Sequence, residues 1–149
     1  FIFQGKRIIL PRPFDLVRDA LDLGNMLEEI WFVGLDVAHA FHQIPLLQNQ
    51  FQFTGVSSND MFYVFEVLVF GSGSGPTVWG RYAAWLGRSM IMLSDQTSLR
   101  AEIYEDDLAF VIRGSAPQPS VEIAIAITWA MGVGFPFSLP KADEGEKLR

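Results

Sequence analysis

The period of the hydrophobic positions changes several times along the chain, and each change predicts a new structural element. Residues 14–30 place apolar side chains at helical spacing with acidic residues mostly on other faces, so we expect a helix there, broken at Gly24-Asn25. Residues 31–37 form an apolar run that is interrupted only by Gly34 and ended by Asp36. Such a run is typical of a strand buried on both faces.

A first hairpin is predicted in the middle of the chain. Residues 51–54 alternate between apolar and polar, residues 57–60 have the composition of a turn, and residues 61–70 are almost entirely apolar. A Gly/Ser-rich loop follows over residues 71–76, and Pro76 suits the first turn of a helix.

The helix after Pro76 has two distinct faces. The basic and aromatic residues Arg81, Trp85 and Arg88 share one face, on which we expect solvent. The opposite, apolar face carries Trp79, Tyr82, Ala83, Leu86, Met90 and Leu93. Residues 100–112 then predict a second hairpin, with acidic residues at its tip.

The last part of the chain predicts a loop, a helix and an extended segment. Residues 121–131 are expected to form a helix capped by Ser120, although every second residue from 123 to 127 is Ile, which also fits a strand. Residues 135–139 are expected to be extended. The element order predicts an α+β fold, in which helices pack on an antiparallel or mixed sheet.

Composition is consistent with one domain. Half of the 149 residues are hydrophobic, including thirteen Phe and four Trp, which is enough for a sizeable core. The chain has no cysteine, which excludes disulfides and cysteine-ligated zinc and fits a reducing compartment such as the cytoplasm or nucleus. The longest apolar stretch, residues 123–137, is too short to span a membrane, and we expect no membrane partner.

Charge limits the nucleic-acid functions that the chain can perform alone. The formal net charge is −6, and no Lys or Arg occurs between Arg18 and Arg81. A surface that neutralises phosphates needs such residues. A stand-alone nucleic-acid binder is therefore not expected.

The candidate chemistry lies in Tyr104-Glu105-Asp106-Asp107 and in Asp36. Adjacent carboxylates on a tight turn repel one another, and a divalent cation such as Mg²⁺, which prefers carboxylate oxygens, would neutralise them. A metal site requires that Asp36 lies on a strand next to the acidic hairpin. The alternative is that Asp36 caps a turn and Asp106-Asp107 is an ordinary acidic loop.

Four segments, in order, resemble the palm motifs of retroelement reverse transcriptases. The first is an Asp followed five positions later by Phe, and the second is a Phe-Gly pair, a small-residue loop, a proline and a helix. The third resembles Tyr-x-Asp-Asp, and the fourth is a Gly-Phe with a downstream lysine. They lie at residues 34–46, 69–76, 104–107 and 134–141, and the stretch from the first to the last takes up more than two-thirds of the chain.

The resemblance implies a fold, a reaction and a set of residues. It implies a palm with helices on one face of an antiparallel sheet and a core like that of ferredoxin or RRM domains. In it, Asp36, Asp106 and Asp107 hold two Mg²⁺ ions, with Mn²⁺ as a substitute, and Lys141 protonates the leaving pyrophosphate. The nucleotide pocket is implied to contain Val37, Phe41, Phe70, Gly71 and Tyr104. The implied partners are a primer–template and deoxynucleoside triphosphates.

Some residues depart from the family pattern. Glu105 stands where the family has a small or apolar residue, and Ser72 and Ser74 replace the usual Leu and Asn. We expect one partial reverse transcriptase domain of a retrotransposon-like element, with residues 1–30 as a leading segment and fingers remnant and residues 31–149 as the palm. Without a thumb or RNase H segment, the isolated chain is expected to have weak activity or none. A decayed palm without activity and an unrelated α+β RNA-binding or interaction module remain alternatives.

Overall fold

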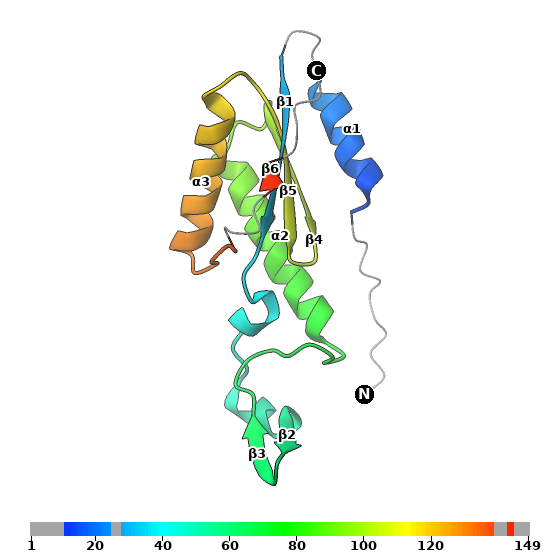
Figure 1. Cartoon of the computed structure of the whole chain (residues 1–149), viewed down its shortest axis with the longest axis vertical. Coiled ribbons are helices and arrows are strands. Elements are labelled where there is room, and N and C mark those ends of the chain that lie inside the picture. Colours follow the sequence, from blue (N-terminus) through cyan, green and yellow to red (C-terminus); the bar gives the residue numbers. More distant parts are fainter. Residues whose placement is uncertain (1–10, 25–27, 139–142, 145–149) are drawn as a thin grey trace.

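The fold is a four-stranded antiparallel sheet with helices packed against it. The computed structural model describes residues 11–24, 28–138 and 143–144. The sheet has the order β4-β5-β1-β6, formed by β1 (Ile30–Asp36), β4 (Leu99–Tyr104), β5 (Asp107–Arg113) and β6 (Asp143–Glu144). All three strand pairs are antiparallel. The α+β fold expected from the sequence is therefore confirmed (Figure 1).

Helix α1 (Pro13–Leu23) begins with a proline and ends where the sequence predicted a break. Pro13 needs no hydrogen-bond partner for its nitrogen at this position. The backbone N–H of Arg12 donates to the carboxylate of Asp15 at 2.8 Å, which closes the first turn. Gly24 follows the last helical residue, and Ile30, which was expected in the helix, instead opens β1.

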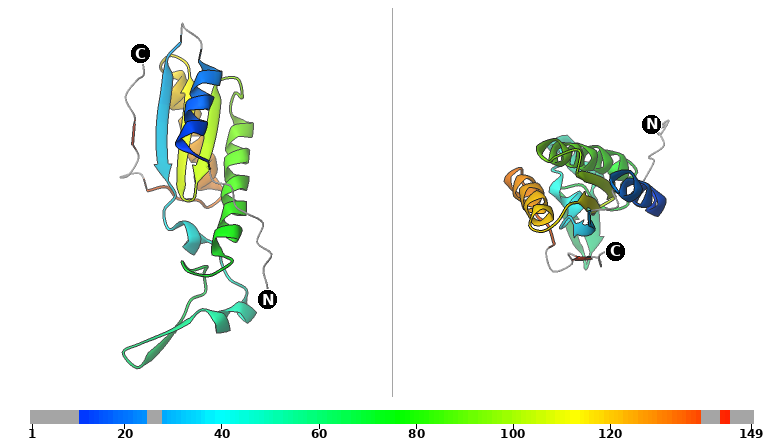
Figure 2. Two further views of the ribbon diagram at one scale, coloured as in Figure 1. Left: turned by 90° about the vertical axis from the view of Figure 1, so that its right-hand side faces the viewer. Right: turned by 90° about the horizontal axis from the view of Figure 1, so that it is seen from above.

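The helices cover both faces of the sheet. Consecutive residues of β4 point to opposite faces, and Ile103 lies under α2 (Gly75–Leu93), within 2.6 Å of a Cβ placed on Gly87. Glu102 faces the other way, toward Asp19 of α1. Figure 2 shows α1 in front of the sheet and α3 (Gln118–Gly132) behind it. Helices α2 and α3, expected in the palm, thus lie on one face as predicted, whereas α1, from the expected leading segment, covers the other face.

The hydrophobic core lies between the sheet and the helix pair α2–α3. Its fully buried side chains come from both helices and from the two central strands, and include Trp79, Leu86, Met90, Leu108, Phe110 and Ile112. Helix α2 begins at the Gly75-Pro76 step, as expected, and its buried face matches the apolar stripe except at Tyr82 and Leu93, which are about half exposed. Among the described residues, no helix is both long enough and apolar enough to cross a membrane.

The first strand of the first hairpin lies four residues later than predicted, and the second begins at residue 61 as predicted but ends at Val64. Its strands are β2 (Gly55–Ser58) and β3 (Met61–Val64), joined by Asn59 and Asp60, which both have positive φ. Two such residues make a type I′ turn, whose twist matches that of the strands. Residues 51–54, expected as a strand, instead lie mostly in a 3-10 helix, η2 (Gln48–Phe53). The hairpin projects from the end of the molecule (Figure 1).

Helix α3 settles the ambiguity between helix and strand near its start. It begins at Gln118, three residues before the predicted start, and its N-terminal flanking residue Pro117 makes no side-chain cap. The prediction that Ser120 caps this helix is therefore wrong, because Ser120 lies inside the first turn. Pro119 occupies a position in that turn where a missing N–H is tolerated.

Glycines in α2 offer a first test of the packing. A Cβ placed on Gly80 meets nothing within 4 Å, so Gly80→Ala is expected to raise the free energy of unfolding by about 0.5–1 kcal/mol through helix propensity. In Gly87→Ala the new methyl would lie 2.6 Å from Cδ1 of Ile103, so the same gain is offset by crowding. Urea unfolding measures both variants, and an equal gain in the two would contradict this packing.

Candidate active site

The acidic residues predicted to converge lie at the ends of two adjacent strands. Asp36 is the last residue of β1 and Asp107 is the first of β5, and they are directly opposite partners in the antiparallel pair. Such partners have Cα atoms about 4.5–5.5 Å apart. Asp106 precedes Asp107 in the turn that joins β4 to β5, and we refer to residues 104–107 as the acidic turn. The fold thus brings Asp36 beside the acidic turn across seventy residues of sequence.

Both carbonyl groups at the tip of this turn are held in place. The carbonyl of Asp106 accepts a hydrogen bond from the N–H of Val37 at 2.9 Å. The carbonyl of Glu105 accepts one from Nε1 of Trp79 at 2.8 Å. These bonds fix the turn to the end of β1 on one side and to α2 on the other. Backbone groups held in this way pre-organise the adjacent side chains.

Glu105 has an unusual backbone conformation. Its φ is +55°, and it is the first of the two residues that connect Tyr104 and Asp107. A positive φ at this position is typical of a type II′ turn, which favours glycine because other residues are strained there. The side chain of Glu105 is exposed.

Glu105→Gly is expected to raise the free energy of unfolding by about 1 kcal/mol, because glycine adopts positive φ without strain. Glu105→Gln removes the same charge but keeps a Cβ at positive φ, so it is the matched control and is expected to change stability little. Thermal unfolding of the two variants separates backbone strain from charge. Equal stabilisation in both would assign the effect to charge instead.

Aromatic side chains pack beside the turn. Phe41, from the 3-10 helix η1 (Ala40–Gln43), is 6% exposed, and its ring centroid lies 4.4 Å from that of Phe70 and 5.9 Å from that of Trp79. Phe70 is 67% exposed, so its ring covers Phe41 on the solvent side. Phe41 therefore lies between an exposed ring and the Trp79 that holds the turn.

The loop before α2 approaches Phe41 closely. Gly71 has φ +87°, a conformation that favours glycine. A Cβ on Gly75 would lie 2.6 Å from Oγ of Ser72 and 3.4 Å from Phe41. The Ser72 hydroxyl is buried and has no hydrogen-bond partner among the described residues. A buried, unsatisfied hydroxyl of this kind points to a bound water or ligand group.

The remaining predicted residues differ in their exposure. Val37 is 2% exposed, so it reaches this region through its backbone, whereas Tyr104 is 51% exposed. The segment before the predicted lysine runs beside β1, since the N–H of Ser138 donates to the carbonyl of Asp36 at 2.8 Å. Lys141 itself lies outside the described residues. Within residues 11–24, 28–138 and 143–144, no three His, Asp or Glu side chains are grouped so that they could already hold a metal ion.

The packing of α1 creates a cavity that the sequence did not predict. It measures about 430 Å³ and is lined by residues of α1, β4 and β5, among them Leu16, Glu102, Tyr104 and Asp107. Partial burial raises the pKa of the Glu102 carboxyl, and the nearby carboxylates of Asp19 and Asp15 raise it further. One wall of this cavity is shared with the acidic turn.

Glu102→Gln is expected to stabilise the protein at pH 7 but not at low pH. A folded-state pKa above the ordinary 4.5 means that the ionised carboxyl opposes folding at neutral pH. This penalty declines as the pH falls through the raised pKa. It is absent below pH 4.5, where the Glu102 carboxyl is protonated in both the folded and the unfolded state. The difference in urea midpoint between variant and wild type should therefore disappear on acidification, and a difference that is constant with pH would contradict it.

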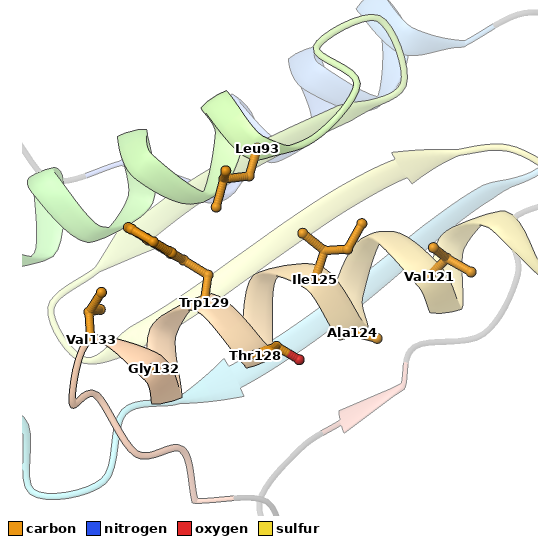
Figure 3. Close-up of a pocket in the computed structure, with 8 residues that line it drawn as sticks. All are labelled: Leu93, Val121, Ala124, Ile125, Thr128, Trp129, Gly132 and Val133. Atoms are coloured by element: carbon orange, nitrogen blue, oxygen red, sulfur yellow. The ribbon is translucent and has the colours of Figure 1, made fainter.

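A second concave surface lies away from the acidic turn. Figure 3 shows this apolar groove of about 590 Å³ between the end of α2 and α3, where Leu93, Ile125 and Trp129 contribute large side chains. Trp129 donates through Nε1 to the hydroxyl of Ser89 at 2.8 Å, which ties the two helices together. No titratable side chain lines the groove. It therefore lacks the chemistry of a catalytic site.

Comparison with known structures identifies the fold. The chain matches prototype foamy virus protease-reverse transcriptase with a TM-score of 0.66 and 16% identity, both in the native protein (86% of this chain covered) and in a selenomethionine-labelled CSH mutant (78%). It also matches the foamy viral protease-reverse transcriptase in complex with an RNA/DNA hybrid, with a TM-score of 0.61 and 15% identity over 76% of the chain. The chain spans only 14–16% of the length of these proteins. Comparison with protein-family models gives no match, and neither does comparison with curated proteins. At this identity the likeness establishes a reverse-transcriptase-like fold.

Proposed function

We propose that this chain is the palm of an RNA-directed DNA polymerase from a retrotransposon-like element, with the β4–β5 turn as its catalytic centre. The observation that carries the proposal is the register of the sheet, which pairs Asp36 with Asp107 and places Asp106 in the adjoining turn. An unrelated sheet-and-helix module would be expected to scatter these residues. The four ordered sequence motifs support the same assignment.

The donor set fits divalent cations. Asp36, Asp106 and Asp107 offer carboxylate oxygens, which Mg²⁺ and Mn²⁺ prefer. Asp36 and Asp107 lie at paired strand ends, and Asp106 lies in the turn whose carbonyl accepts from the N–H of Val37. When bound, two such ions would lower the pKa of a primer 3′-hydroxyl and neutralise charge on a triphosphate. The side chains are not grouped as a finished site, so we expect the aspartates to change rotamer when they bind metal.

The other residues have positioning roles in this proposal. Phe41 limits the space beside the nucleotide sugar, while Phe70, Gly71 and Tyr104 shape the rest of the pocket and Val37 fixes the turn through its N–H. The unsatisfied hydroxyl of Ser72 is placed to bind a polar group of the ligand. Lys141 would protonate the leaving pyrophosphate. The partners are a deoxynucleoside triphosphate and an RNA-templated primer.

A second candidate is a palm that has lost its activity. Glu105 favours it, since a further negative charge in the turn would repel a triphosphate. Both candidates share the fold and differ in metal binding. One titration therefore distinguishes them.

The test is calorimetric titration of the chain with MgCl2, MnCl2 and then dTTP in the presence of each metal. The active palm predicts metal-dependent binding that weakens at least about tenfold in Asp36→Asn and in Asp106→Asn, as expected when a ligand is lost. Asp60→Asn is the matched control, since it removes the same charge at the β2–β3 turn, where Asn tolerates the positive φ. Absence of binding by the wild type would support the decayed palm, and equal losses in all three variants would contradict the site.

A further inference from the structure

One side of α2 carries a basic and aromatic stripe that the catalytic proposal does not use. Arg81, Trp85 and Arg88 are spaced i, i+4 and i+7, so they share one face of the helix. Both arginines are exposed, and Trp85 is 46% exposed. With a rise of about 1.5 Å per residue, the two arginines are separated by about 10 Å along the helix axis. We refer to these three residues as the α2 stripe.

The two arginines of the α2 stripe differ from the other cations of the described residues. Arg12 and Arg18 pair with Asp15, and Arg113 pairs with Glu28 at 2.8 Å. Arg100 donates to backbone carbonyls. Within the part of the chain that the structure describes, Arg81 and Arg88 form neither an ion pair nor a hydrogen bond. In a chain of net charge −6, these two guanidinium groups keep their positive charge available to a ligand.

Trp85 provides a supported planar surface between them. Its ring packs on Phe135 with a centroid distance of 6.3 Å and an interplanar angle of 42°, and Phe135 is itself 7% exposed. The buried ring beneath restricts the orientation of Trp85 and leaves nearly half of its surface to solvent. A restrained, half-exposed indole is suited to stacking with another flat ring.

We propose that the α2 stripe binds single-stranded nucleic acid, with phosphates on Arg81 and Arg88 and a base stacked on Trp85. A nucleic-acid strand is favoured because it alternates negative charge and flat rings, which is what the stripe complements. An acidic peptide would satisfy the arginines but would leave the indole without a flat partner. Recognition through phosphates and stacking carries no sequence preference.

This surface is distinct from the acidic turn. Trp79, which holds the turn through Glu105, lies on the buried face of α2, whereas Arg81 and Arg88 are exposed, and Trp79 and Trp85 share Phe135 as a packing partner. The inference therefore does not depend on metal binding or on catalysis. It assigns the palm a contact with a nucleic-acid strand outside the proposed catalytic centre.

The test is fluorescence anisotropy with a labelled oligouridylate of about 15 nucleotides, a length that covers one such site, at salt concentrations from about 50 to 200 mM. Two phosphate contacts predict a slope of about −1.4 in the logarithm of the binding constant against the logarithm of salt. Each of Arg81→Gln and Arg88→Gln should reduce the slope by about 0.7, and Trp85→Leu should weaken binding about tenfold without changing the slope.

The matched control is the double variant Arg12→Gln/Arg18→Gln, which lowers the net charge as much as Arg81→Gln/Arg88→Gln does. Equal losses in the two double variants, or no binding by the wild type, would overturn the proposal. Stronger competition by oligoglutamate than by unlabelled oligouridylate would identify an acidic peptide as the ligand and would also overturn it. The anisotropy titrations are run in EDTA without added metal, so they do not depend on the metal site, and failure of the catalytic proposal is recognised separately by the calorimetric titration.

Discussion

Trp79→Ala is expected to lower the free energy of unfolding by about 3–5 kcal/mol, which is typical of removing a buried tryptophan. Trp79 is 2% exposed and packs against Phe41 and Phe135, with ring centroids 5.9 and 6.2 Å away. It also donates the hydrogen bond that holds the carbonyl of Glu105. One substitution therefore opens a cavity in the core and releases one side of the acidic turn.

Trp79→Phe separates these two effects. Phenylalanine keeps an aromatic ring in the core but donates no hydrogen bond, so the expected cost is smaller, about 1–3 kcal/mol for the unpaired carbonyl. Urea unfolding measures the stability, and hydrogen exchange of the Val37 amide reports whether the other anchor of the turn persists. If Trp79→Phe cost nothing and left that exchange unchanged, the bond to Glu105 would not be stabilising the turn.

Periodicity was sufficient to predict the elements that carry the acidic residues. The apolar run before Asp36 and the two β-rich flanks of the acidic turn each became strands within one or two residues of the expected limits. Helix α2 was equally clear, because Pro76 marks its start and its apolar positions keep a helical spacing from Trp79 to Leu93. These signals are local, and tertiary packing agrees with them.

The features that the sequence could not predict depend on contacts between distant segments. Periodicity does not indicate that Nε1 of Trp79 reaches Glu105, twenty-six residues later, and the closeness of Asp36 to Asp107 was implied only by the resemblance to the palm motifs. The helical spacing of apolar and acidic residues predicted that α1 exists. It did not predict which face of the sheet the helix covers. The start of α3 was missed because Ser120 is a good capping residue in isolation, whereas the chain enters the helix through Pro117 instead.

Phe41→Ala is expected to have two large effects, one on stability and one on sugar selectivity. The side chain is 6% exposed, so its removal should cost about 3–5 kcal/mol. If Phe41 limits the space beside the sugar, a smaller residue should also admit a 2′-hydroxyl, and the preference for dUTP over UTP should fall at least about tenfold. The measurement is competition between the two nucleotides in the presence of Mg²⁺ or Mn²⁺, below the unfolding temperature of the variant.

Phe110→Ala is the control that separates sugar selectivity from general loosening of the core. Phe110 is fully buried in β5, so its removal should cost as much stability as that of Phe41. Its backbone pairs with Val33 and Ala101, three residues beyond the Asp36–Asp107 pair, and its ring belongs to the core between the sheet and the helices. Selectivity should therefore change in Phe41→Ala and stay unchanged in Phe110→Ala. If the nucleotide preference is unchanged in Phe41→Ala, this residue only packs in the core and does not select the sugar. If the preference changes equally in both variants, any loss of core packing relaxes the pocket.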